Sequence, residues 1–524
     1  MTPTSLTMSR GPSGSVQYFF PWLCAALSGI LLTASFPPYG TEWLAWVCLL
    51  PLLKAIEGRS GAEAFRAGYA AGIVHFLTLM YWVVFVLQRY GGLPTAAGIL
   101  ALLAICFYLS LYVGLFCALA ARLEALPLSG FFMAAAWVAA EYARGHLVIG
   151  VPWCLLGYSQ YARETIIQIA DISGVYGLSF LIVLVNAALY QTFFSGTRRS
   201  RRDTAMNIAL AASMVMLAVW YGAAGKADAG REPSLTKAAV IQANIDQSIK
   251  WDEAYRNETI ETYMNLTEST IGFSPELVVW PETAVPFYFQ NEKDFAAMLS
   301  RFATENRTSL IFGSPAYQRD KDRVRYLNRA YLLTPEDGTV SYDKVYLVPF
   351  GEYVPFKRIL FFVERLVTAA GDFTPGEVIA PLRAGGHSAG AMICFEVIFP
   401  AQARRQALEG ADYFVNLTND AWFGRSSAPH QHLAMSVFRA VENRRAMIRA
   451  ANTGISACID RSGKILNTTG LFTAETLLCT IDTAPSDSTF YTRHGDLAAL
   501  LLIAAALAGY LWTFSGERRN GWKR

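Results

Sequence analysis

The chain has 524 residues, of which 53% are hydrophobic and only 16% are charged. Because soluble domains carry about 25% charged residues, part of this chain is expected to lie in a lipid bilayer. The net charge of +3 and the lack of a basic stripe interleaved with aromatic residues exclude nucleic acid as a partner.

The apolar residues are concentrated in two parts of the chain, and this distribution predicts its domains. A helix needs about 20 apolar residues to span a bilayer. Eight segments approach this length, at 19–35, 43–57, 64–88, 95–121, 129–149, 172–194, 206–224 and 497–514. We therefore predict a membrane domain over 1–230 with about seven spans, a globular domain over 231–490, and a last span with a tail over 491–524.

Lysine and arginine in the loops predict the orientation of the spans, because these residues collect on the cytoplasmic side of membranes. Basic residues occur before the first predicted span, in alternate loops and after the last span: Arg10, Lys54, Arg59, Arg66, Arg122, Arg198, Arg199, Arg201, Arg202, Arg518, Arg519, Lys523 and Arg524. All of them fall on one side if both termini are cytoplasmic. The globular domain is then expected on the other side, outside the cytoplasm.

The globular region alternates strand and helix patterns. Strands are predicted at 236–245, 275–283, 309–317, 389–400, 411–420 and 447–460, with a hairpin over 328–350, and helices at 252–270, 292–306, 401–410 and 428–445. Alternation of this kind is typical of an α/β domain built on layered sheets.

Three of the eight cysteines, Cys394, Cys458 and Cys479, lie in the globular region. An odd number in an oxidising compartment predicts that at least one thiol is free or pairs between chains. No cysteine and histidine cluster has the spacing of a metal site. The string "PHQH", with His430 and His432, offers two ligands, but a polar turn is the favoured interpretation.

Three reactive residues fall where predicted strands end. Glu282 follows the apolar "LVVWP", Lys344 lies in "YDKVYLVPFGEYVPF", and Cys394 lies in "ICFE". Active sites of α/β sheets gather at the carboxyl ends of strands. A cysteine nucleophile needs a base for its proton and a nearby cation, which can also stabilise an acyl oxyanion.

Each of these residues has a simpler explanation when it is taken alone. Cys394 fits core packing, Glu282 fits the acidic first turn of a helix, and Lys344 fits a solvated hairpin. His387 suggests a cysteine–histidine pair. It lies on the opposite side of a glycine-rich turn, so we prefer the glutamate and lysine as partners of the cysteine.

The strings "VVWPET", "YDKVYLVPFGE" and "ICFEVIFP", in this order, resemble the Glu–Lys–Cys signature of the nitrilase, or carbon–nitrogen hydrolase, superfamily. With "VPWCLLGYSQ", "IKWDE", "LVPFGEYVPF", "LTNDAWFG" and the predicted spans, the chain is similar to the apolipoprotein N-acyltransferase family over nearly its whole length. The resemblance implies an α-β-β-α sandwich on a bundle of about eight membrane helices, without cofactor or metal. It also implies a monomer in the bacterial inner membrane, with its catalytic domain in the periplasm.

The resemblance further implies a two-step transfer. Cys394 takes an acyl chain from a phospholipid, such as phosphatidylethanolamine, and forms a thioester. The amino group of an S-diacylglyceryl cysteine at the N-terminus of an apolipoprotein then attacks this thioester. Glu282 is implied as the general base and Lys344 as the electrostatic partner that stabilises the oxyanion.

Four further residues correspond to positions that support activity in the family. Glu352 is implied as a second carboxylate that orients the site, and Trp251 and Glu396 as residues needed for activity. Phe395 stands where some relatives have tyrosine, so its backbone N–H is the expected oxyanion donor instead of a hydroxyl.

The segment 356–371 is apolar on one helical face, which fits either a lid that faces lipid or simple core packing. Two other functions stay open. One is a membrane-tethered amidase, which would share the triad and hydrolyse its acyl-enzyme. The other is a transporter with a soluble binding domain, for which Glu141 and Arg144 are the only close candidates for charges along a path.

Overall fold

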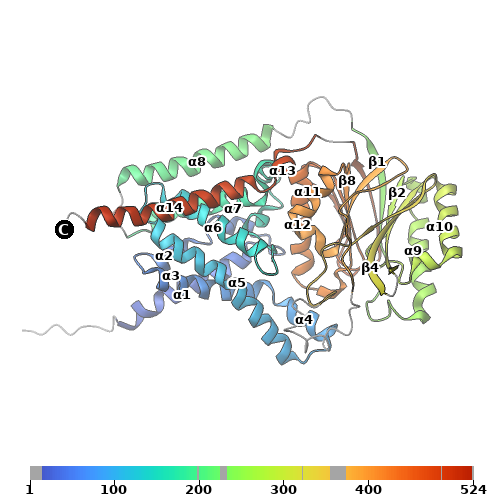
Figure 1. The fold of residues 1–524 in the computed structure, drawn as a ribbon, viewed down its shortest axis with the longest axis horizontal. Coiled ribbons are helices and arrows are strands. Elements are labelled where there is room, and N and C mark those ends of the chain that lie inside the picture. The colour runs from blue at the N-terminus through green and yellow to red at the C-terminus, as the bar shows by residue number, and fades with distance from the viewer. Residues whose placement is uncertain are drawn as a thin grey trace, which may run out of the picture.

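The structure, a computed structural model, describes residues 14–196, 200–224, 233–320, 323–353, 373–484 and 487–521. A helix bundle forms one end of the molecule, and a sandwich of two sheets with flanking helices forms the other (Figure 1). The predicted lid at 356–371 lies outside the described residues.

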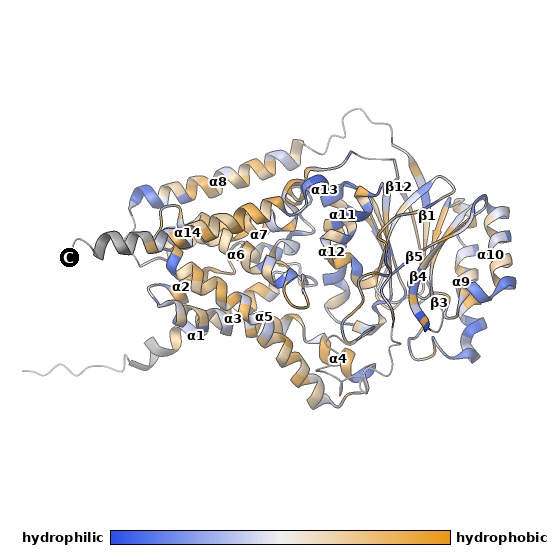
Figure 2. Cartoon of the chain, viewed as in Figure 1, coloured by the Kyte–Doolittle hydropathy of each residue, from blue (hydrophilic) through white to orange (hydrophobic). Residues whose placement is uncertain are grey.

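The bundle consists of the helices that precede the first strand and of the long helix near the C-terminal end. They are α1 (Gly14–Ala34), α2 (Leu50–Ile56), α3 (Gly61–Leu79), α4 (Trp82–Arg89), α5 (Thr95–Leu123), α6 (Ser129–His146), α7 (Ala170–Phe193), α8 (Arg201–Ala224) and α14 (Leu497–Gly521). Most of these helices are strongly apolar, as Figure 2 shows. Their apolar surfaces match the interior of a bilayer.

Fewer helices than predicted are long and apolar enough to cross a membrane. Within the described residues, four helical segments meet both criteria, and they contain α5, α7, α8 and α14, respectively. The pair α3 and α4, bent by 51°, would be a fifth. The predicted span 43–57 instead forms a 3₁₀ turn and the short α2, because Pro51 begins a new helix there. The number of eight spans stays a prediction.

The sandwich contains two six-stranded mixed sheets. The first has the order β12-β1-β2-β3-β4-β5 and the second the order β11-β10-β9-β8-β7-β6. The strands of the first sheet are β1 (Leu235–Gln242), β2 (Leu277–Val279), β3 (Ser309–Asp320), β4 (Arg323–Thr334), β5 (Gly338–Asp343) and β12 (Glu475–Asp482). Those of the second are β6 (Leu382–Ala384), β7 (His387–Ile393), β8 (Tyr413–Thr418), β9 (Met447–Ala451), β10 (Ala457–Ile459) and β11 (Ile465–Thr468).

Helices cover both outer faces of the sandwich. They are α9 (Arg256–Glu268) and α10 (Lys293–Asn306) on the first sheet, with α11 (Pro400–Leu408) and α12 (Ala428–Asn443) on the second, as Figure 1 shows, and α13 (Phe490–His494) precedes α14. Alternate residues of β8 face two different cores: Tyr413 and Val415 pack between the sheets, and Phe414 packs towards the bundle. The layer of α11 and α12 therefore joins the sandwich to the bundle.

Most predicted elements of the sandwich are present, and two differ from the prediction. The predicted strand 389–400 ends at Ile393, because Cys394 has a left-handed backbone (φ 52°) that starts a 3₁₀ turn. The predicted strand 447–460 is a hairpin of β9 and β10, which pair antiparallel. Each break was missed in the sequence because the residues on both sides of the short turn are apolar.

Cys458 and Cys479 form a disulfide that joins β10 of one sheet to β12 of the other. Cys394 is a free thiol. The odd number of cysteines in this region thus divides into one intrachain pair and one free residue, which is one of the arrangements that the sequence allowed.

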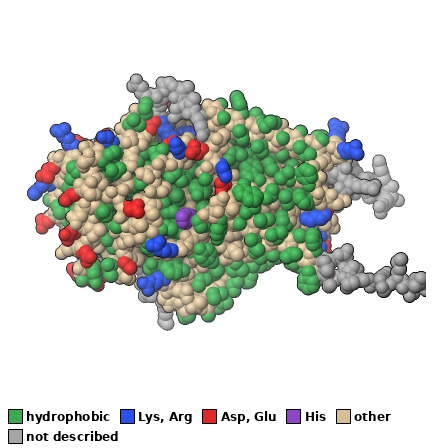
Figure 3. Space-filling model, turned by 180° about the vertical axis from the view of Figure 1, so that it is seen from behind, with side chains coloured by type: hydrophobic (Ala, Val, Ile, Leu, Met, Phe, Trp, Pro, Cys, Tyr) green, Lys and Arg blue, Asp and Glu red, His purple; other side chains and the backbone are tan. Residues whose placement is uncertain are grey.

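The surface reflects the division between bundle and sandwich. Figure 3 shows hydrophobic side chains over the bundle and most Lys, Arg, Asp and Glu side chains over the sandwich. The two parts are joined by specific contacts: Trp153 Nε1 donates to Gln431 Oε1 at 2.8 Å, and the Tyr90 hydroxyl donates to the Ala421 carbonyl at 3.0 Å.

Candidate active site

Cys394 occupies a sharp turn at the carboxyl end of β7, where it begins the 3₁₀ turn Cys394–Ile398. Its left-handed backbone is unfavourable for a residue with a side chain, at a cost of about 1–3 kcal/mol. Its side chain is buried, with 8% of the residue exposed. A strained, buried turn of this kind fixes the direction of the thiol, which is typical of a nucleophile and unnecessary for core packing.

Glu282 lies three residues beyond the end of β2, beside the glycine of the neighbouring strand. A Cβ at Gly313 would lie only 2.8 Å from Glu282 Cα, so only glycine lets the two backbones approach this closely. Glu282 Oε1 accepts a hydrogen bond from Asn328 Nδ2 at 2.8 Å, and Oε2 accepts one from the Asn419 N–H at 3.0 Å. The carboxylate is therefore held at both oxygens.

Lys344 follows β5 directly and is almost fully buried. Its Nζ lies 2.8 Å from Glu352 Oε1 and 3.6 Å from Glu282 Oε1. Glu352 Oε2 also accepts from the Val348 N–H at 2.8 Å. Burial lowers the pKa of Lys344, but the Glu352 and Glu282 carboxylates outweigh it, so its pKa lies above the ordinary value. The ammonium is thus charged at neutral pH.

The environment of Cys394 favours the neutral thiol in the resting site. Burial raises its pKa, the charge of Glu282 raises it further, and Lys344 opposes both. Cys394 is therefore protonated before the substrate binds. The thiol proton has to leave while the sulfur attacks, and Glu282 is the carboxylate in the cluster that can take it.

Glu396 connects the chain after Lys344 to the strand that carries Cys394. Its Oε1 accepts from the N–H groups of Val345 at 2.7 Å and Tyr346 at 3.1 Å, and its Oε2 accepts from the Ile393 N–H at 2.8 Å. Burial raises the pKa of Glu396 to about 7. This carboxylate is placed to hold the positions of Cys394 and Lys344 relative to each other.

The side chains of two other predicted residues add no hydrogen bond to this buried cluster. Trp251 is 53% exposed, on a turn before α9. Phe395 is half-buried and packs edge-on against Phe399 at 5.1 Å between ring centroids. Neither side chain contributes a polar atom to the cluster.

Sequence reasoning missed a second buried lysine at the site. Lys250, beside Trp251, is 2% exposed, and its Nζ donates to the backbone carbonyl of Glu282 at 3.1 Å. Burial lowers its pKa to about 8, although the charge of Glu282 opposes the shift. Lys250 follows the polar string "DQSI", where no local signal distinguishes a buried lysine from a solvated one.

Comparisons with known proteins identify the family of this chain. Residues 28–188 match the apolipoprotein N-acyltransferase N-terminal domain, and residues 237–489 match the carbon–nitrogen hydrolase family. The apolipoprotein N-acyltransferase of Geobacter metallireducens is 42% identical over 490 residues, which cover 93% of this chain and 94% of the relative. That of Methylococcus capsulatus is 33% identical over 513 residues, which cover 95% and 96%. The chain belongs to the apolipoprotein N-acyltransferase family.

Membership of this family confirms the nitrilase-like fold of the sandwich that the three motifs predicted. Within the part of the chain that the structure describes, no group of three or more His, Cys, Asp or Glu residues could hold a metal ion. His387 contacts the Tyr413 hydroxyl at 3.1 Å. It lies at the start of β7, the end opposite to Cys394.

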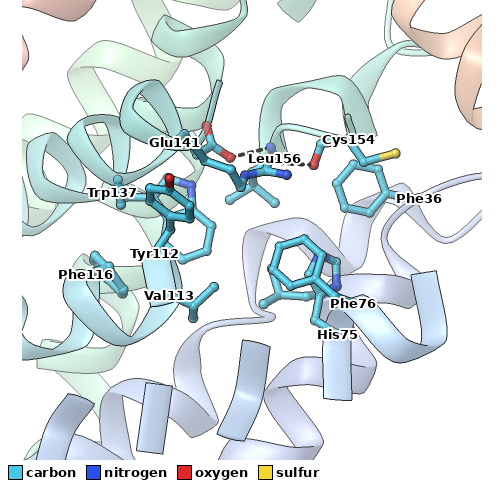
Figure 4. Close-up of a pocket in the computed structure, with 13 residues that line it drawn as sticks. Phe36, His75, Phe76, Tyr112, Val113, Phe116, Trp137, Glu141, Cys154 and Leu156 are labelled. Carbon is cyan, nitrogen blue, oxygen red and sulfur yellow. Dashed lines mark hydrogen bonds between the residues drawn. The ribbon is translucent and has the colours of Figure 1, made fainter. Parts of the chain in front are cut away.

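A separate small cavity lies inside the bundle, between α1, α3, α5 and α6 (Figure 4). Glu141 and Arg144, the candidates for a transport path, both border it. Arg144 Nη1 donates to the Trp153 carbonyl at 2.8 Å, and Glu141 Oε1 accepts from the Leu156 N–H at 2.7 Å. These two charges thus anchor the backbone of the turn between α6 and α7, which argues against a transporter.

Proposed function

We propose that this chain transfers a fatty acyl group from a phospholipid, through a thioester on Cys394, to the N-terminal amino group of S-diacylglyceryl-cysteine on apolipoproteins. The observation that carries the proposal is the buried cluster at Cys394. The Cys394 thiol lies on a strained turn, its pKa is shifted by the charges of Glu282 and Lys344, and Glu352 holds that lysine, in a member of the apolipoprotein N-acyltransferase family. Glu282, Lys344 and Cys394 are its proposed catalytic residues.

In the first step Cys394 Sγ attacks the ester carbonyl of the phospholipid. Glu282 takes the thiol proton as the carbon–sulfur bond forms, because the resting group is the thiol. The Lys344 ammonium stabilises the oxyanion, and Glu352, at 2.8 Å, holds that ammonium in place. When the tetrahedral intermediate collapses, the alkoxide of the lysophospholipid leaves and takes the proton from Glu282.

In the second step the neutral amine of the diacylglyceryl cysteine attacks the thioester. Glu282 takes a proton from the nitrogen as the carbon–nitrogen bond forms and returns it to Sγ as the carbon–sulfur bond breaks. The products are an amide and the restored thiol. Burial of the cluster keeps water away from the thioester, which favours transfer over hydrolysis.

The arrangement of the molecule supports a site that is served by the membrane. We assign the membrane domain to 1–230, the catalytic domain to 231–490 and the last span with its tail to 491–524. The enzyme is proposed as a monomer in the bacterial inner membrane, with eight spans, cytoplasmic termini and a periplasmic catalytic domain. Two lipid-anchored substrates then reach the site by diffusion in one plane.

The test uses the full-length protein in detergent with phosphatidylethanolamine. Intact-mass spectrometry is expected to show an acyl adduct that disappears in Cys394→Ala, and the acyl group is expected to move to the amine of an added diacylglyceryl-cysteinyl peptide. An adduct that is only hydrolysed would identify an amidase. The absence of any adduct would overturn the assignment of Cys394 as nucleophile.

A further inference from the structure

Two buried side chains hold the backbone carbonyl of Cys394. His432 Nε2 lies 3.2 Å from this oxygen, and Asn416 Nδ2 lies 3.4 Å from it. Asn416 is in β8 and His432 is in the second turn of α12, so the two donors come from different elements. Because a carbonyl oxygen only accepts hydrogen bonds, His432 must carry a proton on Nε2.

The other ring nitrogen of His432 faces an ion pair. Nδ1 lies 3.1 Å from Arg449 Nη2 and 3.1 Å from Asp420 Oδ1. The guanidinium can only donate, so in the neutral ring Nδ1 accepts from Arg449. Burial and the positive charge of Arg449 lower the pKa of His432, which favours this neutral form.

The ion pair forms a rigid frame behind the ring. Arg449 Nη2 lies 2.6 Å from Asp420 Oδ2, and both residues are fully buried. Asp420 Oδ1 also accepts from the Thr418 hydroxyl at 2.9 Å. A buried ion pair with its remaining hydrogen bonds satisfied has little freedom to move, so it fixes the orientation of the imidazole.

We infer that His432 is a positioning residue: its Nε2–H holds the carbonyl of Cys394 and thereby the left-handed backbone that directs the thiol towards Glu282 and Lys344. This inference rests on the proposed function of the site. His432 does not act as acid or base in the transfer, because its Nε2 proton is committed to the Cys394 carbonyl. His432 thus contacts the backbone of Cys394 and is not the base that deprotonates its thiol.

The side of the ring away from the sandwich is closed by the bundle. The Trp153 ring stacks on the His432 ring, with 5.8 Å between centroids and 28° between planes. Trp153 comes from the turn that Arg144 anchors through the Trp153 carbonyl. The bundle therefore contributes to the placement of the nucleophile as well as to membrane anchoring.

The test compares His432→Leu with His432→Gln in the full-length protein, by the single-turnover rate of thioester formation with phosphatidylethanolamine. Leucine removes the donor, whereas the glutamine amide can still donate to the Cys394 carbonyl. His432→Leu is expected to slow thioester formation by about 10- to 100-fold with little change in KM, because a small misplacement of a reacting atom has effects of this size. His432→Gln is expected to recover most of the rate.

The matched control is His430→Leu, since His430 lies in the same helix two residues earlier and is only half-buried. It is expected to keep the wild-type rate. If His432→Leu does not fold, the comparison is made between His432→Gln and His432→Asn, whose shorter amide does not reach the carbonyl.

Two results would overturn the inference. One is an unchanged rate in His432→Leu. The other is an equal loss of rate in His432→Leu and His432→Gln, in proportion to their loss of thermal stability, which would indicate a purely structural role. In both cases wild type still forms its adduct. An adduct absent from wild type would instead remove the proposed function, and with it the basis of this inference.

Discussion

The Lys250 ammonium donates a hydrogen bond to the backbone carbonyl of Glu282 at 3.1 Å. This contact places a second buried cation beside Glu282, the proposed general base. Lys344 contacts the carboxylate oxygens of Glu282 and Glu352, whereas Lys250 contacts the backbone carbonyl of Glu282. The two lysines therefore have separate tasks, which can be tested separately.

Replacement of Lys250 by methionine is expected to slow thioester formation by about 10- to 100-fold, because Glu282 loses its backbone anchor and nearby positive charge. Lys344→Met is expected to abolish the adduct. The control is Lys237→Met, at an exposed lysine on β1. Wild-type kinetics in Lys250→Met, measured as single-turnover acylation, would show that the buried ammonium is dispensable.

The pH dependence of the first step is expected to report the charge of Lys250. Burial lowers its pKa to about 8, so the ammonium loses its proton and its charge above this pH, and acylation should slow there. The pKa of Lys344 is raised, and so it stays charged over the same range. In Lys250→Arg the guanidinium keeps its charge, and the alkaline decline should move to higher pH. If the rate of acylation declined near pH 8 equally in wild type and in Lys250→Arg, the decline would not report the charge of Lys250.

Glu396→Gln is expected to lower both stability and the rate of acylation. Each oxygen of Glu396 accepts backbone hydrogen bonds, and the amide group of glutamine would place a donor against one of these N–H groups. The expected loss is about 1–3 kcal/mol of unfolding free energy, measured by thermal or denaturant unfolding. Glu377→Gln, at an exposed carboxylate paired with Arg325, serves as the control. Equal melting temperatures for the two variants would contradict this role for Glu396.

The backbone of Cys394 predicts an unusual order of stability between two inactive variants. Alanine at a φ of 52° keeps the steric strain, whereas glycine relieves it. Cys394→Gly is therefore expected to be more stable than Cys394→Ala by about 1 kcal/mol. The same pair of residues is compared at position 391 in β7, where Ala391→Gly should destabilise. The prediction fails if glycine is the less stable residue at both positions.

The disulfide between Cys458 and Cys479 joins the two sheets of the sandwich. Its removal, in the double variant Cys458→Ala with Cys479→Ala, is expected to lower the unfolding free energy by about 2–4 kcal/mol. Acylation by the folded protein should change little, because the disulfide lies on β10 and β12, whereas Glu282, Lys344 and Cys394 follow β2, β5 and β7. A reducing agent should lower the melting temperature of wild type but not that of the double variant. If the reducing agent also lowered the melting temperature of the double variant, the effect on wild type would not come from this disulfide.

The sequence by itself determined the character of the molecule. Apolar runs of membrane length and the alternation of strands and helices predicted a membrane domain joined to an α/β domain. The three motifs around Glu282, Lys344 and Cys394 resemble those of the nitrilase superfamily, and this resemblance implied the acyltransferase activity. These signals are local: each depends on neighbouring residues, and so it can be read without knowledge of distant contacts. The number of helices that can span a bilayer was less certain, because breaks such as that at Pro51 lie inside apolar runs.

Only the tertiary structure decided which polar residues surround Glu282 and Cys394. Lys250, Asn328 and His432 lie on three different elements, and nothing near them in sequence distinguishes them from solvated lysines, amides and turn histidines. The pairing of Cys458 with Cys479 likewise depends on the stacking of two sheets. The physical reason is the same throughout, since burial and hydrogen bonding are created when segments distant in sequence pack together.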